Sequence, residues 1–129
     1  MMNALLVALG GGLGALCRYA VSALSAKSPA HGFAWGTTAV NLVGCLLIGF
    51  AAGALERSMI PRLAWLLLVT GFLGGFTTFS TFSLETMELF RNGAAVRAIA
   101  FSGLQVVGGL LATAGGLALA LRLFRAAPA

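Results

Sequence analysis

Residues 71–83 read GFLGGFTTFSTFS, and this stretch decides how the rest of the chain is interpreted. It lies in the uncharged run 63–84, which is long enough to cross roughly 30 Å of hydrocarbon as a helix. The glycine pair Gly74 and Gly75, followed by five hydroxyl residues in seven, makes a poor continuous helix. In a bilayer, freed backbone groups persist only where protein, a wet cavity or an ion satisfies them. We therefore predict a broken membrane-spanning helix; a kink stabilised by the hydroxyls is the simpler alternative.

The composition also indicates a membrane protein. Of 129 residues, 60% are hydrophobic and 9% are charged, whereas soluble domains average about a quarter charged. Three more uncharged runs approach or exceed the length of a spanning helix. The fold class we predict is an all-α membrane protein, a single transmembrane domain over 1–129 with helices at about 3–25, 34–55, 62–90 and 97–122.

Several other classes of protein are disfavoured. A net charge of +5 rests on only eight cations against three glutamates, too few for a nucleic-acid binder. The two cysteines lie in apolar runs, where we expect no disulfide. No nucleophile with a base, metal cluster or paired carboxylates is visible, so we do not expect an enzyme. Reading the first segment as a signal peptide is disfavoured because no basic segment precedes it and Arg18 lies within it.

The cations do not choose an orientation in the membrane. Lys and Arg normally gather on cytoplasmic loops, but here they divide four against four. One side holds Arg57, Arg62, Arg122 and Arg125, and the other holds Arg18, Lys27, Arg91 and Arg97. Two interpretations remain open: the first helix decides the topology, or copies insert both ways and pair antiparallel, as an inverted repeat does within one longer chain.

A few polar and aromatic side chains lie at membrane depth. Asn41 shares a helix face with Thr37, and its amide can donate two hydrogen bonds, either to a neighbouring helix or to an anion. Phe79 and Phe82, three residues apart, lie on one face and either pack or offer their positive ring edges to an anion. Arg18 either extends to the interface or concentrates anions at an aqueous mouth.

Three blocks of sequence resemble one known family. Residues 11–19 read GGLGALCRY, residues 36–44 read GTTAVNLVG, and residues 71–83 form the third and most specific block. In length, number of spans and the order of these blocks, the chain resembles the Fluc, or CrcB, family of fluoride channels. The resemblance implies an antiparallel, dual-topology homodimer in the bacterial plasma (inner) membrane, with two fluoride pathways and a structural sodium ion at the dimer centre.

The resemblance also implies roles for individual residues. Asn41 would donate its amide to fluoride, and Phe79 and Phe82 would offer ring edges. The rest of the pathway would comprise the hydroxyls of Ser80 and Thr81, Thr37 at the approach, Ser102 on the fourth helix and Arg18 in the vestibule. Backbone carbonyls of Gly74 and Thr77 would hold the sodium ion. The family often has a tyrosine one turn before the serine on the fourth helix, where this chain has Ala98.

The function that we expect is passive, selective export of cytoplasmic fluoride. Many modest donors suit conduction because they compensate dehydration without holding the ion. The alternatives are a small four-helix drug or cation exporter and a non-transporting assembly subunit. The exporter needs a membrane-embedded carboxylate, which the first helix lacks and which Glu85, near a helix end, supplies poorly. The assembly subunit leaves the Thr-Phe-Ser block unexplained.

Overall fold

The computed structural model describes residues 1–26 and 34–124. Most of those residues are helical, and none of them forms a strand. The first two spans are α1 (Met2–Ala26) and α2 (Trp35–Glu56). The third consists of α3 (Arg62–Trp65), the π-helical η1 (Leu66–Leu73), α4 (Gly74–Phe76) and α5 (Phe79–Arg91). The fourth consists of α6 (Ala95–Gly103), the π-helical η2 (Leu104–Gly108) and α7 (Gly109–Leu123).

The four predicted spans are confirmed as helices long and apolar enough to cross a membrane. The largest difference in their bounds is at the fourth, which begins at Ala95 where the sequence predicted 97. Lys27 and Arg125, two of the cations in the charge tally, lie outside the described residues. The equal division of Lys and Arg between the two sides therefore stays a prediction.

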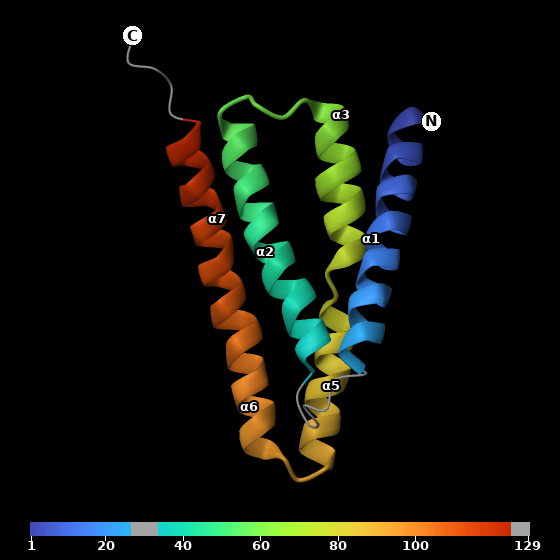
Figure 1. Cartoon of the computed structure of the whole chain (residues 1–129), viewed down its shortest axis with the longest axis vertical. Helices are drawn as coiled ribbons and strands as arrows, with labels where there is room; N and C mark the ends of the chain where they lie inside the picture. The colour runs from blue at the N-terminus through green and yellow to red at the C-terminus, as the bar shows by residue number, and fades with distance from the viewer. Residues whose placement is uncertain (27–33, 125–129) are drawn as a thin grey trace.

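The spans run side by side, and the start of α1 lies at the same end of the bundle as the end of α7 (Figure 1). α2 packs mainly against α7, while α1 packs against η1 and α4. The turn between α5 and α6 contains Gly93 at φ +71°, a left-handed conformation that glycine adopts without steric cost.

Glycines set how closely these helices approach. A Cβ built on Gly14 of α1 would overlap the carbonyl oxygen of Phe72, and one on Gly116 of α7 would overlap that of Leu46. Helices in lipid associate through such close backbone contact because no hydrophobic force draws them together. Gly14 and Gly116 therefore pack closely, whereas no atom lies within 4 Å of a Cβ built on Gly115.

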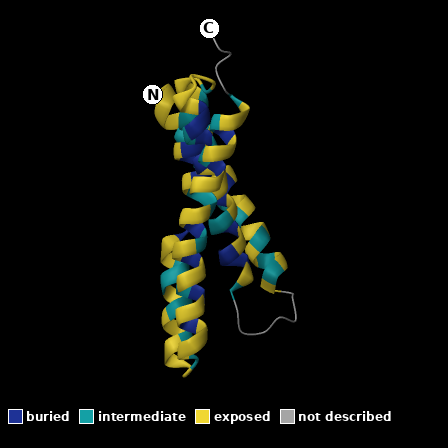
Figure 2. Ribbon diagram, turned by 90° about the vertical axis from the view of Figure 1, so that its left-hand side faces the viewer, coloured by how far each residue is buried: buried dark blue, intermediate teal, exposed yellow. Residues whose placement is uncertain are grey.

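Large apolar side chains are exposed along every span (Figure 2). Leu13, Leu68 and Leu110 are examples from three different spans. The buried core is small by comparison, and its only large, fully buried side chains are Phe101 and Val40 among the described residues. Such an apolar exterior is favourable in hydrocarbon and costly in water. The chain is a multi-pass membrane protein.

Candidate functional site

The third span is interrupted between α4 and α5. Thr77 (φ −77°, ψ 158°) and Thr78 (φ −151°, ψ 115°) have extended backbones, so α4 ends at Phe76 and α5 begins at Phe79. The interruption falls within the glycine- and hydroxyl-rich stretch 71–83. It frees polar backbone groups at membrane depth, and these groups need partners.

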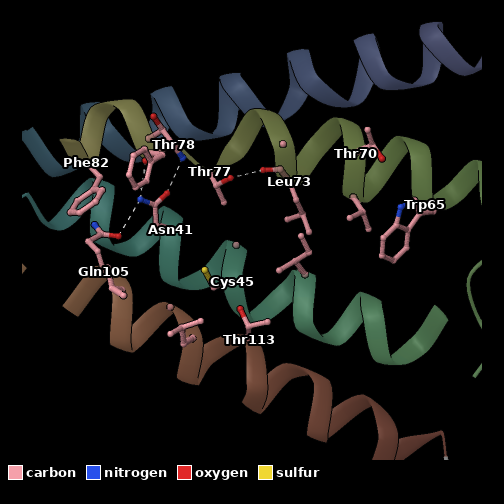
Figure 3. Close-up of a pocket in the computed structure, with 18 residues that line it drawn as sticks. Asn41, Cys45, Trp65, Thr70, Leu73, Thr77, Thr78, Phe82, Gln105 and Thr113 are labelled. Carbon is pink, nitrogen blue, oxygen red and sulfur yellow. Dashed lines mark hydrogen bonds between the residues drawn. The ribbon is translucent and has the colours of Figure 1, made fainter. Parts of the chain in front are cut away.

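The side-chain amide of Asn41 in α2 forms hydrogen bonds with both the backbone amide and the backbone carbonyl of Thr78. Its Oδ1 accepts from the Thr78 amide at 2.8 Å, and its Nδ2 donates to the Thr78 carbonyl at 3.0 Å. The second Nδ2 hydrogen goes to Oε1 of Gln105, 3.1 Å away on η2 (Figure 3). The side-chain amide of Asn41 therefore joins α2, the interruption and the fourth span.

The Thr78 hydroxyl organises the start of α5. It accepts from the Thr81 amide at 3.2 Å, capping the helix, and it donates to the Thr81 hydroxyl at 3.0 Å. Ser80 Oγ lies 3.2 Å from the hydroxyl oxygen of Thr78. Thr78 is buried. The predicted hydroxyl residues Ser80 and Thr81 are thus tied to the interruption through Thr78, which the sequence analysis did not single out.

Three phenylalanine rings run from the surface toward the core. Phe79 and Phe82 meet edge to face, with centroids 5.3 Å apart and planes at 65°. Phe82 lies 5.5 Å from Phe101 at 55°. Phe79 is 77% exposed and Phe101 is fully buried. Tilted rings present positively polarised edges to their surroundings as well as to each other.

A groove of about 740 Å³ opens over this region. It is lined by α2, the third span and the fourth span, and most of its lining is apolar (Figure 3). Among the predicted site residues the groove brings together Asn41, Gly74, Thr77, Phe79 and Phe82. The remaining predicted residues lie outside its lining: Arg18, Thr37, Ser80, Thr81 and Ser102.

Thr37 and Arg18 lie on α2 and α1, outside the lining of the groove. Thr37, 4% exposed, donates to Oε1 of Glu85 at 2.9 Å, which connects α2 to α5 beyond the interruption. Arg18 is half-buried on α1. This contact between Thr37 and Glu85 was not predicted from the sequence.

The fourth span presents a different polar residue from the one predicted. Ser102 is half-buried outside the groove, whereas Gln105 lines it and contacts Asn41. Gln105 is the only glutamine in the chain and lies within an apolar run. A polar side chain at that depth is the signal that would have identified it.

The backbone carbonyls of Gly74 and Thr77, predicted from the sequence to hold a cation, lie at the interruption. In a continuous helix these carbonyls would accept from the amides of Thr78 and Thr81. Those amides instead donate to Asn41 Oδ1 and to the Thr78 hydroxyl. Gly74 is also exposed, and the nearest atom to a Cβ built there is 4.0 Å away. No group of three or more His, Cys, Asp or Glu side chains that could hold a metal ion occurs among the described residues.

Comparison of the sequence with known proteins identifies a family. A family model described as "CrcB-like protein, Camphor Resistance (CrcB)" matches residues 5–117. The chain belongs to the CrcB family. The match extends over all four spans of this CrcB chain and includes Asn41, the interruption and Gln105.

Individual CrcB relatives are similar over nearly their whole length. A protein of Azotobacter vinelandii is 50% identical over 117 residues, covering 89% of this chain and 94% of the relative. One of Hyphomonas neptunium is 43% identical over 126 residues, covering 96% and 99%. One of Pseudomonas putida is 48% identical over 115 residues, covering 88% and 92%. Each relative is named "Fluoride-specific ion channel FluC".

Proposed function

We propose that this chain is a fluoride-selective channel of the bacterial inner membrane, through which cytoplasmic fluoride leaves passively down its gradient. The relatives' name supports this proposal. The structural observation that carries it is the interrupted third span, at which an amide, hydroxyls and phenylalanine edges gather around Asn41. The function requires no catalytic chemistry.

These groups suit a small, strongly hydrated anion. Amide and hydroxyl hydrogens replace water around the ion, and ring edges add a weaker attraction. None of them carries a full charge, so the ion is compensated without being trapped. In this proposal the path runs along Phe79, Phe82, Ser80 and Thr81 beside Asn41. Thr37, Ser102 and the Arg18 vestibule serve its approaches.

The proposed conducting unit is an antiparallel homodimer of chains with dual topology. Phe79 is 77% exposed, although it belongs to the site, and Gly74 presents open backbone beside it. A second copy would cover both and would supply the wall that the groove lacks. The evenly divided cations are consistent with insertion in both orientations.

A sodium ion at the centre of this dimer is part of the proposal. The Gly74 and Thr77 carbonyls of the two copies would hold it, because their helical amide partners are engaged elsewhere. Carbonyl oxygens are hard ligands of the kind that a hard cation prefers. When bound, the ion would supply fixed positive charge near the anion path.

Ion efflux from liposomes containing the purified protein tests the channel. We expect rapid fluoride release and negligible chloride release, measured with ion-selective electrodes, because the site is built for a small anion. Fluoride release no faster than from protein-free vesicles would exclude the channel. In vesicles prepared with N-methyl-D-glucamine in place of sodium we expect slower fluoride release, and an unchanged rate would remove sodium from the proposal.

Sided labelling in cells tests the dual topology. Single cysteines replacing Glu56 or Asn92, at the two opposite turns, are introduced with Cys17→Ala and Cys45→Ala in the background. If chains insert both ways, an impermeant maleimide will label part of each population from outside and the remainder only after permeabilisation. Labelling of only one of the two sites from outside would establish a single orientation and contradict the antiparallel dimer.

A further inference from the structure

The hydrogen bonds of Thr78 determine the orientation of the Asn41 amide. Only Oδ1 can accept from the Thr78 amide, and only Nδ2 can donate to the Thr78 carbonyl. Exchanging the two atoms would oppose donor to donor and acceptor to acceptor. One Nδ2 hydrogen remains after these contacts, and it points to Gln105.

The orientation of Gln105 follows from that of Asn41. The atom facing Asn41 Nδ2, 3.1 Å away, must be an acceptor and is therefore Oε1. The other terminal atom of Gln105 is Nε2, which carries two hydrogens. This atom is buried and has no hydrogen-bond partner among the described residues. An unsatisfied buried donor is costly and rare in native proteins.

The residue that carries this donor lies at the wall of the groove rather than in a sealed core. Gln105 is 9% exposed, and it lines the groove together with Asn41 and Phe82. Phe101, one turn earlier on the fourth span, contacts Phe82 and places this helix face beside the phenylalanine rings. In Figure 3 the Gln105 amide points toward Asn41 and Phe82.

We propose that Nε2 of Gln105 is the buried amide donor that binds fluoride in this chain. This inference rests on the proposed channel function and deepens it. Both Nδ2 hydrogens of Asn41 are engaged, so Asn41 positions the site, while Gln105 offers two hydrogens to the anion. A neutral amide suits conduction because it attracts the ion without the strong hold of a cation.

Nuclear magnetic resonance on the native protein tests the contact directly. Because the chain contains one glutamine, labelling glutamine side chains with ¹⁵N gives a single amide pair, that of Gln105. We expect its resonances to move saturably when sodium fluoride is added and to stay in place with equal sodium chloride. Unmoved resonances in a preparation that conducts fluoride would overturn the assignment while leaving the channel intact. A preparation without fluoride conduction would instead contradict the proposed function on which the assignment rests.

Substitution provides an independent measurement. Gln105→Met keeps the length of the side chain but removes both its donor and the acceptor that Asn41 Nδ2 uses, so we expect fluoride efflux to fall at least about tenfold. Val107→Met places the same side chain at a 57% exposed position outside the groove and is expected to conduct at the native rate. A folded Gln105→Met protein with native efflux would refute the proposal.

Discussion

Asn41→Asp will reduce fluoride efflux from liposomes by about 100-fold or more, the largest effect that we expect from any single substitution in the site. The new carboxylate oxygen would face the Thr78 carbonyl and Gln105 Oε1, both of which now accept from Nδ2. Losing a buried donor and opposing two acceptors costs roughly 3–6 kcal/mol in total, and each 1.4 kcal/mol corresponds to about a factor of ten. The negative charge also repels an anion in the path.

The control for this change is Asn3→Asp, the same substitution at an exposed position on α1 outside the groove. It should leave efflux unchanged. Thermal unfolding of both purified variants shows whether the loss of efflux comes from conduction or from misfolding. A folded Asn41→Asp protein that conducts fluoride at the native rate would contradict the central place given to this amide.

Gly116→Ala will destabilise the bundle by about 1–3 kcal/mol or more, the range measured for overpacking. A Cβ at this position would overlap the Leu46 carbonyl oxygen and lie 2.8 Å from the Phe50 amide nitrogen. Both are backbone atoms, so α7 must move away from α2 rather than rotate a side chain. We expect a lower unfolding temperature in detergent, followed by circular dichroism.

Gly115→Ala is the matched control, one residue earlier on the same helix. No atom lies within 4 Å of a Cβ built there, and alanine is the better helix former. Its unfolding temperature should therefore equal or exceed that of the native protein. Equal losses from the two substitutions would mean that close approach of α2 and α7 does not determine stability.

Sequence alone was sufficient for features that depend on one helix at a time. The length and polarity of uncharged runs predicted the four spans, since the width of the bilayer fixes how long a span must be. Asn41 was recognised as a residue whose amide needs partners, because a polar group at membrane depth must be satisfied. Neither inference required knowledge of how the helices are rotated.

Pairings between helices could not be predicted in this way. Ser102 was expected to serve the pathway from the fourth span, but Gln105 is the residue that meets Asn41. The rotation of that helix depends on its packing, including the π-helical turn η2, and the spacing of residues does not determine it. The Thr37–Glu85 hydrogen bond joins residues 48 positions apart and was missed for the same reason.

The two hydrogen bonds between Asn41 and the backbone of Thr78 also bear on how the protein works over time. A carrier that alternated access by bending its third span at the interruption would have to break both hydrogen bonds and form them again for every ion moved. Each such bond contributes about 0.5–1.5 kcal/mol net, and exposing its buried partners would cost more. In a pore with fixed walls these two hydrogen bonds stay formed while ions pass. The contact between Asn41 and Thr78 therefore favours diffusion of ions through a static pore over a cycle of conformational changes.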